Sequence, residues 1–241
     1  MVDSKLAPVA EQHTKEFDQY ADNYEAIIAD PLRDQFANGS VFFHQRKIDV
    51  LMESLQSQGK NPSQLDWLDM GCGKGDLLSL GAKKFRKAFG CDVSTGLLAQ
   101  VEGVEVRRQT SDTEVPFDDN SVDVVTAACV YHHIEPAMRL AITKSVYRAL
   151  RPGGMFCIFE HNPLNPVTRK IVARCPLDVN AILLPHGESD QLMHDASFKQ
   201  SKTVHYLFLP EGIFAMMGAM EGLLKWLPIG GQYAAIGIKS L

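Results

Sequence analysis

The sequence predicts an α/β protein built on a doubly wound, mostly parallel sheet of seven strands. Three observations carry this prediction. Short apolar runs alternate with segments whose apolar residues recur at helical spacing, in the order βαβαβ and then βαβ. A glycine-rich stretch, GCGKG, directly follows the first apolar run, as in the strand–loop–helix units of parallel sheets. A short helix joins the last two strands, which favours an antiparallel pair at the C-terminal edge.

Two amphipathic segments precede the first strand. Residues 11–30 carry apolar side chains at helical spacing and stop before Pro31, and residues 41–59 repeat the pattern up to a glycine. We therefore expect residues 1–60 to form an N-terminal helical cap. Residues 61–241 would then form the domain that contains the sheet, a length that a single core can serve.

The central region supplies five strands and the helices between them. Its short apolar runs, of which the fourth is long and β-branched, predict strands at 65–70, 87–92, 104–109, 121–132 and 155–160. The intervening segments predict helices that begin near residues 75, 94 and 137, the last of them closed by the RPGG turn. Because the carboxyl ends of parallel strands meet at one edge of the sheet, we expect ligand-binding residues there.

The last third of the chain is less regular. Residues 161–190 are rich in proline and fit no crossover unit, so we expect a lid or ligand-binding insertion over about 161–202. A strand over 202–210, a helix from 211 to 226 and a strand over 232–239 complete the predicted sheet. The methionines of this helix predict either a plain core or subunit contact, the latter in a homodimer, or the lining of an apolar pocket.

Composition and charge narrow the classes of function. The chain has 45% hydrophobic and 22% charged residues, and its net charge of −5 comes without a concentrated basic face, which argues against nucleic acid as a partner. The five cysteines include no CxxC pair, which fits a reducing cytoplasm and argues against a disulfide framework or a zinc site. No apolar run is long enough to predict a membrane span.

The three glycines of the GCGKG stretch are the strongest local signal. Gly71, Gly73 and Gly75 occupy alternate positions, and each carries a backbone-entropy cost. A tight turn without a ligand is one explanation, but a turn that needs one positive φ angle would need one glycine. Three of them predict a main chain that lies close to a nucleotide-type ligand.

Two kinds of ligand fit such a loop. A dinucleotide site follows the pattern GxGxxG and directs a helix N-terminus at a pyrophosphate, but position 76 holds Asp76 in place of the third glycine. That carboxylate would face the phosphates with the wrong charge. The spacing GxGxG instead suits a nucleoside cofactor without a pyrophosphate, and NAD remains the rival ligand.

The sequence resembles the class I S-adenosylmethionine-dependent methyltransferases, in particular their small-molecule group, over roughly residues 17–160. LDMGCGKG is similar to the acidic residue and GxGxG loop of that family, with Asp69 as the acid, and GCDVS ends the second strand on Asp92. The resemblance implies a Rossmann-like fold, S-adenosylmethionine as the cofactor, and both ribose hydroxyls bound by Asp92. An NAD enzyme would have the same acid, so Asp92 alone does not discriminate.

Further motifs of this resemblance imply the rest of the cofactor site. SDTEVPFDDNSVDVV resembles the stretch that precedes the fourth strand, but Ser111 stands where the family usually has Asp, so Asp112 or the backbone of Thr113 would take the adenine. Tyr24 in FDQYADNY would close over the methionine end, or else it is a core aromatic of an amphipathic helix. The implied cofactor-binding residues are Tyr24, Asp69, Gly71, Cys72, Gly73, Asp92, Val93, Asp112, Thr113 and Cys129.

The resemblance implies transfer of a methyl group from a sulfonium to a nucleophile on a small-molecule acceptor, a biosynthetic intermediate. His132 and His133 in CVYHHIEP, and His161 in FEHNPLNP, follow the fourth and fifth strands and are the candidate general bases. The alternative is that they serve packing or turns, and in a strand the adjacent pair would point in opposite directions. We expect no metal. The rival functions are an NAD-dependent oxidoreductase and a non-catalytic S-adenosylmethionine-binding module.

Overall fold

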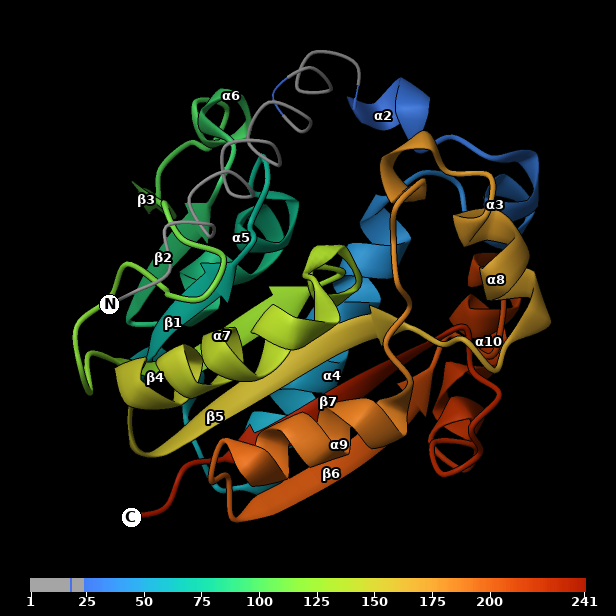
Figure 1. Ribbon diagram of the computed structural model, residues 1–241. Helices are drawn as coiled ribbons and strands as arrows, with labels where there is room; N and C mark the ends of the chain where they lie inside the picture. The colour runs from blue at the N-terminus through green and yellow to red at the C-terminus, as the bar shows by residue number, and fades with distance from the viewer. Residues whose placement is uncertain (1–17, 19–23) are drawn as a thin grey trace.

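The computed structural model describes residues 18 and 24–241 (Figure 1). Most of the helix predicted over 11–30 lies outside the described residues. Helix α2 covers Tyr24–Ile27, and α3, Pro31–Phe36, begins anew at the proline, where Asp30 accepts hydrogen bonds from the backbone amides of Leu32 and Arg33. Proline suits this first helical position because its missing N–H would have no partner there.

The sheet has the seven strands that the sequence predicts, and their order is β3-β2-β1-β4-β5-β7-β6. The strands β1 to β5 are parallel, and β7 is antiparallel to both of its neighbours. The C-terminal pair therefore forms the antiparallel edge, with β6 outermost. The bounds are β1 Asp66–Met70, β2 Lys87–Asp92, β3 Glu105–Arg108, β4 Val122–Ala128, β5 Leu150–His161, β6 Gln200–Tyr206 and β7 Gln232–Ile238.

Helices cover both faces of the sheet (Figure 1). One face buries a cluster that includes residues of α7 and α9, and the other buries a cluster that includes residues of α4 and α5. The central strands are therefore buried on both sides and read as continuous apolar runs. The bounds are α4 Val41–Ser57, α5 Asp76–Gly81, α6 Thr95–Leu98, α7 Pro136–Ala149, α8 Pro166–Val172, α9 His186–Asp195 and α10 Glu211–Glu221, with 3-10 turns η1 Pro62–Gln64, η2 Ala82–Lys84, η3 Tyr131–His133 and η4 Pro176–Asp178.

The fourth strand ends earlier than the sequence predicts. It stops at Ala128, because Cys129 takes a left-handed conformation with φ of 59° and the chain turns into η3. The apolar run from 121 to 132 thus divides into a strand and a turn. This division places the two adjacent histidines, His132 and His133, on a 3-10 turn at the carboxyl edge of the sheet instead of in the strand.

The proline-rich insertion divides in the same way. Its first half contains α8 and η4, which lie beside the carboxyl ends of the strands. Its second half contains α9, which packs on β6 and β7 and on α7. Only the first half is therefore placed to contact a ligand.

Candidate active site

A cavity of about 540 Å³ lies at the carboxyl ends of the strands. Its volume falls within the roughly 300–1,000 Å³ that small-molecule sites occupy. The lining includes the glycine loop and the ends of β2, β4 and β5, together with α3, α4 and α8. This is the edge at which parallel α/β sheets bind ligands.

The glycine loop requires all three glycines for its own backbone. Gly71, Gly73 and Gly75 have φ angles of 68°, 53° and 86°, which side chains rarely adopt. A β-carbon on Gly71 would lie 2.4 Å from Cγ2 of Val130, and one on Gly75 would lie 3.2 Å from both γ-carbons of Val101. The expectation that one glycine would suffice for the turn is thus wrong. Gly71 and Gly73 line the cavity, and of the three glycines only Gly73 could carry a β-carbon without a close contact, its nearest neighbour being Cδ1 of Leu97 at 4.0 Å.

Asp92 ends β2 beside this loop and lines the cavity. Its two carboxylate oxygens accept hydrogen bonds of 2.8 Å from the backbone amides of Gly73 and Ser94. Burial raises the pKa of Asp92 because the charged form loses water, while these amides act in the opposite direction. The amide of Val93 acts on the same carboxylate, which has about four acceptor positions in all, so Asp92 can still accept a hydrogen bond from a ribose hydroxyl.

The same edge of the sheet does not suit a pyrophosphate. Helix α5 begins at Asp76, whose carboxylate lies 3.4 Å from Nζ of Lys74 and 3.9 Å from Nε2 of His44. A diphosphate at this helix N-terminus would meet a negative charge in the first turn. The loop therefore fits a nucleoside cofactor better than a dinucleotide.

The structure brings six of the predicted cofactor residues to the cavity wall: Gly71, Gly73, Asp92, Val93, Asp112 and Cys129. Asp69, Cys72 and Thr113 do not line it. Asp69 lies beneath the loop, where it accepts a 2.6 Å hydrogen bond from Thr126, and burial raises its pKa to about 7. The side chain of Tyr24 lies outside the part of the chain that the structure describes.

Sequence reasoning missed several polar residues of the cavity wall, among them Lys47, Gln109 and Asp178. Lys47 is only 3% exposed, and no carboxylate of the described chain lies within ion-pair distance of it. Its position in α4, four residues after Phe43 and four before Leu51, puts it on the apolar side of the helix, which was the signal available in the sequence. Gln109, just after β3, donates to the carbonyl oxygen of Ser111.

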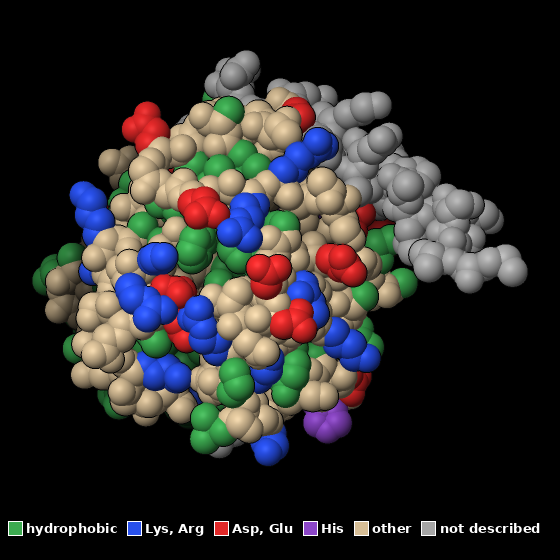
Figure 2. All heavy atoms as spheres, turned by 90° about the vertical axis from the view of Figure 1, so that its left-hand side faces the viewer, with side chains coloured by type: hydrophobic (Ala, Val, Ile, Leu, Met, Phe, Trp, Pro, Cys, Tyr) green, Lys and Arg blue, Asp and Glu red, His purple; other side chains and the backbone are tan. Residues whose placement is uncertain are grey.

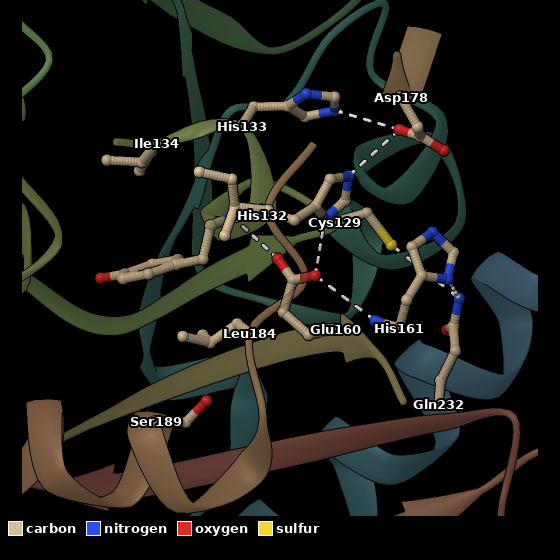
Figure 3. A network of polar contacts seen from close by, with 12 residues as sticks. Cys129, His132, His133, Ile134, Glu160, His161, Asp178, Leu184, Ser189 and Gln232 are labelled. Carbon is tan, nitrogen blue, oxygen red and sulfur yellow. Dashed lines mark hydrogen bonds and ion pairs between the residues drawn. The ribbon is translucent and has the colours of Figure 1, made fainter. Parts of the chain in front are cut away.

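The cavity wall also includes three histidines and Asp178, and the fully buried Glu160 contacts them (Figure 3). Glu160 on β5 accepts a 2.6 Å hydrogen bond from Nδ1 of His132 and a 2.8 Å bond from the amide of Tyr131. Oδ1 of Asp178 lies 3.3 Å from Nε2 of His132 and 3.5 Å from Nε2 of His133. The rings of the adjacent histidines are 4.2 Å apart and both approach Asp178, which corrects the expectation that they point in opposite directions.

The three histidines differ in charge. Burial lowers the pKa of His132, but Glu160 and Asp178 outweigh it and raise that pKa well above the usual value. Burial and the neighbouring charge of His132 lower the pKa of His133 to about 3 and that of His161 to about 4. At neutral pH, His132 is therefore an imidazolium between two carboxylates, and the other two rings are neutral.

Three of these groups could also hold a cation. The nearest ligand atoms of His132, His133 and Asp178 lie within 4.8 Å of one another. A metal ion would have to displace the Nε2 proton of His132, which Glu160 and Asp178 together stabilise. A metal therefore competes with the hydrogen-bonded form of the cluster.

The asparagines of the HNPLNP segment are structural. Asn162 donates to the carbonyl oxygens of Pro228 and Gly230. The carbonyl of Asn165 caps α8 by accepting from the amides of Val167 and Thr168. These bonds fix α8 at the mouth of the cavity, and they use the amide groups that could otherwise have contacted a ligand.

Known proteins resemble this chain in sequence and in fold. Residues 68–158 match the family model described as "Methyltransferase domain". The chain is 30% identical over 111 residues to the tRNA N(3)-methylcytidine methyltransferase Mettl2 of Drosophila melanogaster, a match that covers 39% of this chain and 33% of the relative. It is 33% identical over 170 residues to the protein named "Probable S-adenosylmethionine-dependent methyltransferase" from Mycolicibacterium smegmatis, covering 65% of this chain and 58% of the relative. The matches thus span one third to somewhat more than half of these relatives.

The solved structure of an S-adenosylmethionine-dependent methyltransferase from Thermotoga maritima has the same fold, with a TM-score of 0.65 and 17% identity, over 94% of this chain and 99% of that one. The predicted sheet, its antiparallel edge and the glycine loop at the end of β1 all agree with this similarity of fold. Residues 68–158 thus match a methyltransferase domain, and the chain has the fold of a solved S-adenosylmethionine-dependent methyltransferase.

Proposed function

We propose that the protein transfers a methyl group from S-adenosylmethionine to a small, largely apolar acceptor. One observation carries the proposal: the same cavity contains Gly73 and Asp92 at one end and the histidines with Asp178 at the other. Methyl transfer needs donor and acceptor in one space that excludes water, since the methyl group passes directly between them.

The residues at the loop end fit the donor. S-adenosylmethionine supplies a methyl group that its sulfonium charge has already activated. Asp92 would accept hydrogen bonds from the ribose, and Asp112 with Gln109 would contact the adenine. Lys47 would pair with the carboxylate of the methionine end. The charge of Lys47 lowers the pKa values of both Asp69, beneath the loop, and His161, so Lys47 lies close enough to influence both the donor and the acceptor residues.

The residues at the other end fit the removal of a proton. His133 and His161 line the cavity and are neutral at physiological pH, so either can accept the proton that a methylated oxygen or nitrogen releases. His132 has the opposite property, since its proton is held between Glu160 and Asp178. We assign His132 a positioning role, in which its charge fixes Asp178 and the η3 turn beneath the acceptor.

The acceptor we propose is a metabolite-sized biosynthetic intermediate, and not a nucleic acid, although one relative is a tRNA methyltransferase. Between the donor residues and the mouth, the cavity wall is largely apolar. It includes Ile27, Ile28, Phe36, Phe43, Ile134, Ile171, Leu177, Leu207 and Phe208. A nucleic-acid site would need cations along a backbone track, whereas the whole chain carries a net charge of −5.

Two measurements test this function and its rivals. Titration calorimetry with S-adenosylmethionine, S-adenosylhomocysteine and NAD should show binding of the first two alone, and tight NAD binding would contradict the assignment. Incubation with methyl-labelled S-adenosylmethionine and a cell extract should then yield a labelled small molecule. Binding without any labelled product would instead favour the non-catalytic module, and label in the RNA fraction would favour a nucleic-acid acceptor.

A further inference from the structure

Exposed apolar side chains gather at one end of the molecule. Of the large apolar residues that are exposed in the described chain, all but Val41 and Leu241 lie between positions 164 and 229. They belong to α8, to the segment after η4, and to α10 with the turns that follow it. They are Leu164, Val167, Val179, Ile182, Ile213, Met216, Met217, Met220, Leu223, Trp226 and Ile229, and we call this set the apolar rim.

Helix α10 presents its apolar face outward. The side that packs on α4 carries Phe214 and Glu221, where Phe214 contacts Phe42 and Glu221 forms a buried ion pair with Arg46. The other side carries the exposed methionines, of which Met216 is 86% exposed. A helix that only covers a core shows the reverse pattern, with its apolar stripe inward. The expectation that these methionines form a plain core is therefore wrong.

The apolar rim surrounds the mouth of the active-site cavity. Val167 of α8 and Ile229, after α10, belong both to the rim and to the cavity wall. The two segments are joined directly, since Asn165 donates a 2.8 Å hydrogen bond to the carbonyl oxygen of Ile229 and Thr168 donates a 2.9 Å bond to that of Gly231. The exposed apolar surface thus continues into the cavity.

Exposed cations are concentrated on the α8 side of the rim. Arg169 and Lys170 of α8 are exposed, and so is Arg174, two residues after the helix ends. The sequence from 161 to 177 contains no Asp or Glu. Arg174 lies 3.7 Å from Asp30. The two acids of α10 are engaged, because Glu211 accepts from the amide of Asn38 and Glu221 pairs with Arg46.

The face turned away from the rim has a different character. Figure 2 shows Lys and Arg side chains interspersed with Asp and Glu, and hydrophobic side chains only in small groups. The chain as a whole is acidic, with a net charge of −5. A local combination of exposed apolar side chains and cations, within an acidic protein, is the composition of surfaces that lie on anionic lipid.

From these observations we propose that the apolar rim docks on the surface of an anionic lipid bilayer, with α10 lying in the interface and α8 facing the headgroups. No helix in the described ranges is long and apolar enough to cross a membrane, so the contact is peripheral. The cavity mouth then opens toward the bilayer and takes an acceptor that carries a lipid tail. This last statement rests on the proposed function, whereas the docking itself does not.

Vesicle binding tests the docking without any methyl transfer. The full chain is mixed with vesicles of phosphatidylcholine alone or of phosphatidylcholine with phosphatidylglycerol, and the bound fraction is measured by flotation. We expect binding to the anionic vesicles, weakened by salt. The double variant Met216→Glu/Leu223→Glu should lose roughly tenfold or more in affinity, and Arg169→Glu/Lys170→Glu roughly fivefold per cation. Leu241→Glu, which also alters an exposed leucine but away from the rim, should bind like the unmodified protein.

Intrinsic fluorescence gives a second readout. The chain has two tryptophans, of which Trp67 is fully buried and Trp226 is 77% exposed in the rim. Anionic vesicles should therefore shift the emission to shorter wavelength, and Trp226→Phe should remove the shift. The proposal is overturned if the protein binds neither vesicle, or if the rim variants bind as well as Leu241→Glu. It is also overturned if light scattering shows a dimer that the rim variants abolish while vesicles leave the emission unchanged, since the rim would then contact a second copy. Vesicle binding combined with a failure to bind S-adenosylmethionine would contradict the proposed function and leave the docking intact.

Discussion

Asp92 accepts hydrogen bonds from the backbone amides of Gly73 and Ser94, and burial raises its pKa more than these amides and that of Val93 lower it. We expect Asp92→Asn to weaken S-adenosylmethionine binding by roughly tenfold to a hundredfold, because a hydrogen bond to a charged group contributes about 1.5–3 kcal/mol. Asparagine keeps one acceptor for the loop, so the fold should persist. Calorimetry measures the affinity, with Asp118→Asn at an exposed turn as the control. An unchanged affinity would remove the ribose role from this residue.

The neutral histidines make a separate prediction about pH. Their pKa values, about 3 for His133 and about 4 for His161, lie below the usual value, so protons bind to them only in acid. We expect kcat/KM to stay level between about pH 6 and 8 and to fall only as the pH drops toward these values. Stopped assays across this range, with circular dichroism to verify folding, measure the profile. An inflection near the ordinary histidine pKa would point to another base.

Substitution separates the roles of the histidines. One of the two substitutions, His133→Gln or His161→Gln, removes the residue that accepts the proton. We expect that substitution to lower kcat by roughly a hundredfold or more and to leave the affinity for S-adenosylmethionine unchanged. The exposed His194→Gln is the matched control. If neither substitution slows turnover, the proton leaves by another route.

At the scale of elements, the glycines of the loop from β1 to α5 serve either the loop's own backbone and packing or the close approach of a ligand. Gly71→Ala would place a β-carbon 2.4 Å from Val130 and strain a φ of 68°, so we expect a loss of about 2–4 kcal/mol in the free energy of unfolding. Gly73→Ala meets no close neighbour and should lose only about 1–2 kcal/mol through strain. Urea unfolding measures both, and Gly71→Ala/Val130→Ala should recover the part that is due to contact. Equal losses for the two single variants would show that the packing against Val130 is unimportant.

The elements that the sequence predicted best are those with strong local signals. The strand over 87–92 has the predicted bounds, and the helix over 41–59 is only two residues shorter than predicted, because short apolar runs and periodic apolar residues depend little on distant contacts. The end of β4 could not be predicted from its apolar run. The left-handed turn at Cys129 interrupts that run, and only the contacts of η3 with Glu160 show why.

At the scale of the whole molecule, one buried ion pair links the N-terminal helices to the C-terminal region. Nη2 of Arg46 on α4 donates a 2.5 Å bond to Oε2 of Glu221 on α10, and its guanidinium lies 4.0 Å from the centre of the Phe214 ring. Glu221 also accepts from the amide of Phe208, at the cavity wall. The pair therefore holds α10, and with it one side of the cavity mouth, against the body of the protein.

Removal of one residue of the Arg46–Glu221 ion pair should destabilise the protein. We expect Glu221→Ala to lower the free energy of unfolding by about 3 kcal/mol, the lower end of the range for breaking a buried pair, because Arg46 would lose its buried carboxylate and keep only its ion pair with Asp49. The double variant Arg46→Met/Glu221→Leu should recover most of this loss, since it removes both buried charges and leaves only the partly exposed Asp49 without its ion pair. Denaturant titration measures both variants. A double variant as unstable as Glu221→Ala would show that packing, and not the unpaired charge, causes the loss.

The sequence by itself determined the order of the strands and helices, the glycine loop and the acid at the end of β2, because each of these depends on neighbouring residues in the chain. Only the tertiary structure decided which polar groups share the cavity. Lys47, Asp178 and Gln232 come from segments far apart in the sequence, and burial together with close charges sets the different pKa values of the three histidines. Those effects act through space, and no local pattern encodes them.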